Sequence, residues 1–129
     1  MGLIEKRAIA KIRDEVVPRY EAELQKIAGD QVSYEIVWDS FLDDIRALEN
    51  LEEKCFRAIN DVFKKITVDD IGIEAVAESV KQIRISNGKS ANIQEFTLQD
   101  GVLDMPWDWS GWPGSFYPKT VQEKIETLL

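Results

Sequence analysis

The residues from Asp104 to Pro118 carry the side chains of this chain that are best suited to binding another molecule. Three of the four tryptophans lie within six residues here, and two more aromatic residues and two aspartates accompany them. Indole rings stack on sugars and peptides or contact cations, so this combination is typical of a recognition surface. The candidate binding residues are Asp104, Trp107, Asp108, Trp109, Trp112, Phe116 and Tyr117.

The same segment has a second interpretation, in which its rings are buried. Pro106, Gly111 and Pro113 argue against a regular helix or a central strand, so we expect a loop here. Such a loop closes one end of a sheet by burying its own rings, each of which covers roughly 150–250 Å². Trp38 is then a candidate neighbour. The two interpretations can hold together, with one tryptophan buried and another exposed.

Motifs for catalysis and cofactor binding are missing from the chain. It contains no histidine, which removes the commonest general base and the commonest metal ligand. Asn87-Gly-Lys-Ser90 is similar to the end of a phosphate-binding loop, but Ile83 stands where the first glycine is required, so we expect a polar loop. No spacing of aspartates matches a calcium loop. The sequence therefore favours a non-enzymatic protein, with no catalytic residue, metal site or cofactor predicted.

The charge balance indicates which partners suit the chain. Lysine and arginine number 16, aspartate and glutamate number 24, and the formal net charge is −8. Nucleic acids and anionic membrane surfaces attract clustered basic residues, so both are disfavoured as partners. The run from Asp39 to Glu53 has six acidic residues and one base, Arg46, and is a candidate surface for a basic partner.

Cysteine usage and hydropathy bear on the compartment. Cys55 is the only cysteine and can form no internal disulfide, which favours a reducing compartment. No apolar run approaches the roughly 18 residues of a membrane span, and the first residues are charged from Glu5 onward. We expect a cytoplasmic protein.

A long amphipathic helix over 40–66 is the element that should organise the fold. Its apolar residues recur every three or four positions except at one gap, which Leu51 or Glu52 must span. Ser40 is the expected N-cap. The apolar stripe consists of Phe41, Ile45, Leu48, Cys55, Ile59, Phe63 and Ile66.

Helical periodicity also covers residues 3–28, where Pro18 predicts a kink or a division into two helices. Alternation predicts a strand over 32–38. A short helix starts near Thr67 and should turn Ile71 and Ala75 inward, with Val76 as a further candidate.

The C-terminal half reads mainly as strands. Alternation around Ile83 and Ile85 predicts a strand that ends at an Asn87-Gly88 turn. Residues 93–99 and 102–106 should form a hairpin around Asp100-Gly101, and a last helix covers 120–129.

These elements predict one α+β domain over residues 1–129, in the order α-β-α-α-β-β-β-α. We expect an antiparallel sheet of about four strands, with the long helix and the N-terminal helix on one face.

For function, the first hypothesis is a protein–protein interaction module, resembling an inhibitor, an immunity protein or an adaptor in physical character, that uses the loop at 104–118. The expected partner is another protein, with basic proteins among the candidates, or a second copy in a homodimer. The alternative is a small-ligand-binding, glycan-binding or carboxylate-based catalytic domain with a pocket at the same loop.

Overall fold

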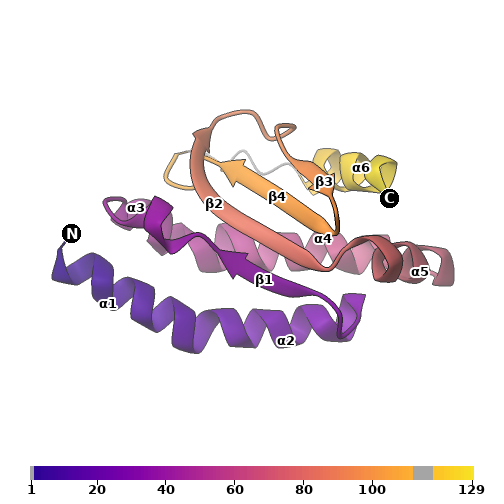
Figure 1. The fold of residues 1–129 in the computed structure, drawn as a ribbon, viewed down its shortest axis with the longest axis horizontal. Helices are drawn as coiled ribbons and strands as arrows, with labels where there is room; N and C mark the ends of the chain where they lie inside the picture. Colours follow the sequence, from indigo (N-terminus) through magenta and orange to yellow (C-terminus); the bar gives the residue numbers. More distant parts are fainter. Residues whose placement is uncertain (1, 112–117) are drawn as a thin grey trace.

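The computed structural model describes residues 2–111 and 118–129 (Figure 1). The helical elements are α1 (Leu3–Lys11), the π-helical segment η1 (Ile12–Val16), α2 (Val17–Ala28), the 3-10 turn η2 (Trp38–Phe41), α3 (Ile45–Asn50), the π-helical segment η3 (Leu51–Arg57), α4 (Ala58–Ile66), α5 (Asp70–Ser79) and α6 (Pro118–Leu128). The strands are β1 (Ser33–Ile36), β2 (Gln82–Ser90), β3 (Thr97–Gln99) and β4 (Val102–Trp107). The predicted α+β class and the predicted order of elements are confirmed.

The predicted antiparallel sheet is wrong, because the sheet is mixed. Its strand order is β1-β2-β4-β3, with β1, β2 and β4 parallel and only β3 antiparallel to its neighbour. The predicted hairpin is present as β3 and β4. However, β4 also pairs with β2 along its other edge, and this pair is parallel. The connection from β1 to β2 runs through η2, α3, η3, α4 and α5, which gives it the length that a parallel β1–β2 pair requires.

The N-terminal helix accommodates Pro18 without ending. Pro18 has no N–H to offer the carbonyl of Asp14, and the helix passes this point through the π-helical segment η1. The long central helix likewise contains η3, and Leu51 fills the gap in its apolar stripe with a fully buried side chain.

That central helix begins later than predicted. Asp44, not Ser40, is its N-cap, because its carboxylate accepts the Ala47 N–H at 3.0 Å. The Ser40 hydroxyl instead donates to the Val37 carbonyl at 2.6 Å, within the turn that follows β1.

The helices cover one face of the sheet and one of its edges. In Figure 1, α4 and α6 lie behind the sheet, while α1 and α2 run along the side of β1. Inward-facing side chains of β2 and β4, such as Ile83, Ile85, Leu103 and Met105, are fully buried. Residues that alternate with them on these strands are only half-buried.

A buried polar network joins β1, α2 and α4. The Tyr34 hydroxyl donates to the Asn60 side-chain oxygen at 2.7 Å. The Asn60 amide group donates in turn to the Tyr20 carbonyl at 3.0 Å and to the Glu23 carboxylate at 2.9 Å. Asn60 is fully buried, so these bonds fix one relative position of the three elements.

The free edge of β1 is occupied by side chains of α2. The Tyr34 N–H donates to the Glu21 carboxylate at 2.8 Å, and the Gln25 amide donates to the Val32 carbonyl at 3.1 Å. Two backbone groups at or beside this edge, the Tyr34 N–H and the Val32 carbonyl, are therefore bonded within the chain.

Candidate functional site

The two described tryptophans of the predicted binding segment are buried. Trp107 is 4% exposed and Trp109 is 1% exposed. The Trp107 ring lies 5.6 Å from Phe96, edge to face, and 5.3 Å from Trp109. Trp107 also belongs to β4, so the expected loop begins only after it. In this conformation both rings support the sheet from its covered side.

Trp109 is held by its polar atoms as well. Its indole N–H donates to the Ser86 carbonyl at 3.0 Å, and its own carbonyl accepts the Asn50 amide at 2.8 Å. These two bonds connect the end of β4 to β2 and to α3, which explains how a chain of irregular backbone stays in place.

Asp108 closes the turn that follows β4. Its carboxylate accepts the Ser110 hydroxyl at 2.7 Å, the Ser110 N–H at 3.1 Å and the Gly111 N–H at 3.2 Å. The bond from the Ser110 hydroxyl is the main cause that lowers the pKa of Asp108. The carboxylate is thus engaged within its own turn.

The remaining predicted residues lie elsewhere. Asp104 is on the opposite, uncovered face of the sheet, where it pairs in register with Arg84 and Thr97. Trp112, Phe116 and Tyr117 lie outside the described residues. The structure therefore does not bring Asp104 together with the described tryptophans, and the proposed binding role of the segment stays a prediction.

A polar cluster of Asp44, Asn87 and Lys89 lies where the parallel strands end. Lys89 contacts the Asp44 carboxylate at 2.5 Å, and the Asn87 amide donates to the same oxygen at 3.0 Å. Burial acts to raise the pKa of Asp44. The bonds from Lys89, Asn87 and the Ala47 N–H outweigh burial and hold that pKa at about 2.

The cluster is better suited to holding the fold than to catalysis. A carboxyl group with a pKa of about 2 is a weak proton acceptor near neutral pH. Its two oxygens already bind the start of α3 and the end of β2. Asp44 therefore joins the central helix to the sheet.

The sequence predicts a turn at Asn87-Gly88 and a polar loop after it. In the structure, residues 87–90 instead form an irregular end of β2. Between the pairs Ile85–Met105 and Ser90–Trp107 the register shifts, and Lys89 has a φ of 63°. A Cβ on Gly88 would lie 2.4 Å from the Pro106 carbonyl oxygen, so the two strands approach closely here. An isolated glycine inside a strand pattern is the signal for such a bulge.

The uncovered face of the sheet carries a row of charges. Glu35 on β1 contacts Arg84 on β2 at 3.5 Å, and Arg84 stands in register with Asp104 on β4. A hollow of about 230 Å³ adjoins this row, lined by Arg84, Thr97, Gln99, Asp100, Val102 and Asp104. Among the described residues, none donates a hydrogen bond to the carboxylates of Asp100 or Asp104.

The acidic run at 39–53 is partly neutralised by the fold. Asp44, Glu52 and Glu53 form ion pairs with Lys89, Arg19 and Arg57 respectively. The run is therefore a weaker candidate for a basic partner than its sequence indicates.

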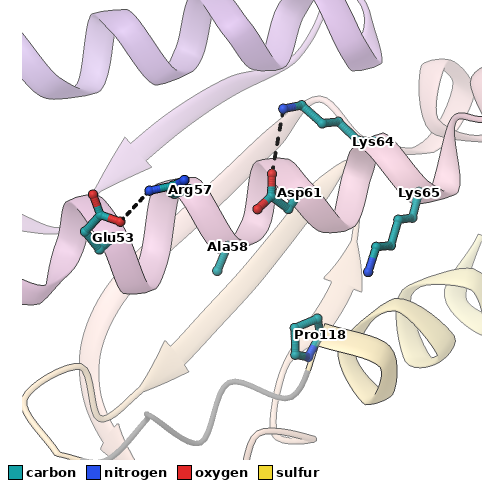
Figure 2. Close-up of a pocket in the computed structure, with 7 residues that line it drawn as sticks. All are labelled: Glu53, Arg57, Ala58, Asp61, Lys64, Lys65 and Pro118. Carbon is teal, nitrogen blue, oxygen red and sulfur yellow. Dashed lines mark hydrogen bonds and ion pairs between the residues drawn. The ribbon is translucent and has the colours of Figure 1, made fainter.

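A second hollow, of about 510 Å³, lies along α4 (Figure 2). Arg57 contacts Glu53 at 2.9 Å and Lys64 contacts Asp61 at 3.7 Å, both along the same helix. These charges are paired at the surface and point to no particular ligand.

Residues 2–111 and 118–129 contain neither a metal-binding group of side chains nor a membrane-spanning helix. No group of three or more acidic, cysteine or histidine side chains there is placed to hold a metal ion. None of the helices in these ranges has both the length and the apolar character needed to cross a bilayer.

The chain matches no protein-family model, no curated protein and no solved structure. Its function is therefore inferred from geometry alone.

Proposed function

We propose that this chain is a non-enzymatic protein-binding module whose partner docks on the uncovered face of the sheet. One observation carries the proposal. Three of the four strands are parallel, an arrangement that in all-parallel sheets occurs with both faces covered. Here the described helices cover one face and leave the other open (Figure 1). A partner would supply the missing layer.

The charges on this face favour a partner that presents lysine or arginine. Among the described residues, the face and its adjoining turn carry three carboxylates, on Glu35, Asp100 and Asp104, against the two bases Arg84 and Lys81, the latter packed beside the turn at Gly101. Arg84 is already paired with Glu35. Asp100 and Asp104 are the groups that would receive the partner's cations, and the net charge of −8 would speed the encounter.

The segment at 104–118 also contributes to this proposal, because Asp104 belongs to it and its buried Trp107 and Trp109 pack on the covered side of the sheet. The buried Cys55 bears on the cellular compartment. Because a free thiol is typical of reducing compartments, we propose that the protein is cytoplasmic.

Photo-crosslinking tests the docking face. A crosslinking amino acid at Gln82, on the uncovered face, should capture a basic protein from a lysate of the cells that make this chain. The same amino acid at Ala22, on the exposed side of α2, is the control. Equal capture from both positions would contradict the proposal.

Charge reversal sharpens that test. Asp104→Lys should weaken capture by about tenfold or more, because it opposes the partner's cations. Asp61→Lys makes the same change on α4, where the carboxylate is 54% exposed, and should leave capture unchanged. If both variants weaken capture equally, general charge and not the sheet face is responsible.

A further inference from the structure

Large aliphatic side chains are exposed at two opposite ends of the molecule. They are Leu3 (59%), Ile4 (69%), Val68 (77%), Ile71 (81%), Ile73 (44%) and Leu128 (38%). The first two begin α1, and the others lie on or beside α5 and α6, at the far end of the long axis in Figure 1. Single exposed aliphatic residues are ordinary, but Val68 and Ile71 line one groove together and form a patch.

Helix α5 supplies Ile71 to this patch. Its sequence combines aliphatic residues with acids at Asp70, Glu74 and Glu78, and we expected Ile71 and Ala75, with Val76 as a further candidate, to point inward. Instead Ile71 is 81% exposed, and Val76 is the residue of α5 that is fully buried. The predicted inward position of Ile71 is therefore wrong: α5 keeps an aliphatic side without a partner in the fold.

A groove runs between α5 and the ends of α4 and α6. Its volume is about 320 Å³, and its apolar lining consists of Ile66, Val68, Ile71, Ala75 and Leu129. A Cβ on Gly72 would lie 1.8 Å from the Ile66 carbonyl oxygen, so α5 sits directly against the end of α4. This close approach fixes the floor of the groove.

The charges around the two ends are complementary. Asp69 and Glu126 line the groove, and Asp70 and Glu74 are exposed on the same helix as Ile71. At the other end, Lys6 and Arg7 follow Leu3 and Ile4 and are exposed. Each end also carries a charge of the other sign: Glu5 is near the start of α1, and Lys65 lines the groove. An acidic rim around an apolar groove fits a basic segment that begins with two aliphatic residues.

We propose that the start of α1 of one copy, with Leu3 and Ile4, inserts into the α4–α5–α6 groove of a second copy. The two surfaces are at opposite ends of one chain, so the contact is head-to-tail and leaves a free groove and a free α1 on each dimer. Growth then gives short chains or a closed ring. This inference does not depend on the uncovered sheet face.

Sedimentation velocity over a range of concentrations tests the proposal. The unchanged protein should sediment faster as its concentration rises. Ile4→Glu and Ile71→Glu should each weaken association by about tenfold or more, since each places a carboxylate in the contact. Both substitutions lie in the first turn of a helix, where an acid is tolerated, so circular dichroism should show a folded protein.

Two controls make the result specific. Ile73→Glu is the same change two residues further along α5, at a position that does not line the groove, and should have a much smaller effect. Mixing Ile4→Glu with Ile71→Glu should restore a dimer and nothing larger, because the mixture retains one intact groove and one intact α1.

Three results would overturn the inference. The unchanged protein stays monomeric at every concentration, the mixture fails to form a dimer, or Ile71→Glu abolishes association while Ile4→Glu does not. The last result would mean that the groove of one copy binds a surface of the other copy that does not include the start of α1.

Discussion

The segment Met105–Gly111 and helix α5 are both rich in apolar residues, yet the fold treats them differently. Trp109 is 1% exposed, whereas Ile71 is 81% exposed. The difference follows from position: β4 lies inside the sheet, between β2 and β3, and its inward side chains meet the helices. Helix α5 connects α4 to β2 at one end of the molecule, where it packs against α2 and the end of α4 but leaves the side that carries Ile71 open.

This contrast teaches that apolar content alone does not locate the core. A side chain is buried when a second layer lies opposite it, and the layer is set by strands distant in sequence. Apolar side chains that lack such a layer are the better candidates for contacts between molecules.

Truncating a buried side chain in the first region tests the difference between the two regions most strongly. Trp109→Ala should lower the free energy of unfolding by about 3–5 kcal/mol, because it empties a buried site and leaves the Ser86 carbonyl without its indole donor. Denaturant unfolding measures this. A loss under about 1 kcal/mol would mean that the ring is not part of the core.

Gly88→Ala tests the close approach of β2 to β4 at Pro106. The new methyl would meet the Pro106 backbone at 2.4 Å, so we expect a loss of about 1–3 kcal/mol in the same unfolding assay. Gly2→Ala is the control, since its methyl would meet only the flexible side chain of Glu5. Equal losses from both variants would argue against a tight contact at β2 and β4.

Asp44→Asn tests the charge of the polar cluster while keeping the N-cap, since asparagine caps as well as aspartate. The pKa of Asp44 is lowered, so its ionised form stabilises the fold above the usual carboxyl pKa, and that stability is lost as pH falls from about 4 to about 2. The variant should be about 1 kcal/mol less stable at pH 6, because Lys89 is exposed and solvent screens the pair. The gap should close near pH 2 in unfolding measurements; a gap independent of pH would contradict this origin.

Ile71→Ala is expected to have the smallest effect. With its side chain mostly in water, the free energy of unfolding should change by no more than about 0.5 kcal/mol at a concentration where the chain is monomeric. Thermal unfolding of the dilute protein measures it. A loss comparable with that of Trp109→Ala would show that α5 is packed more closely than its exposure indicates.

Most of the element order could be predicted because it depends on local patterns. The stripe from Phe41 to Ile66, the alternation around Ile83 and the Asp100-Gly101 turn are each read within a few residues. Strand pairing was not predictable in the same way. The parallel pairing of β2 with β1 and β4 depends on connections that carry no local signal.

The candidate sites show the same division. The charged row of Glu35, Arg84 and Asp104 is assembled from three strands, so no single stretch of sequence reveals it. Lys89 was read as part of a polar loop, because its contact with Asp44 joins residues 45 positions apart. By contrast, the aromatic segment was prominent in the sequence, but its composition suited a buried role as well as an exposed one.

The carboxylate of Glu21 against the Tyr34 N–H has a consequence for how the sheet can meet other chains. At one edge of the sheet, side chains of α2 bond to β1 and to Val32 beside it. The other edge is the three-residue strand β3, so neither edge offers a long stretch of free backbone for pairing with a foreign strand. Both described edges of the sheet are therefore poor places for a foreign strand to add. Any partner of this sheet would contact side chains on its open face and would not extend its backbone hydrogen bonding.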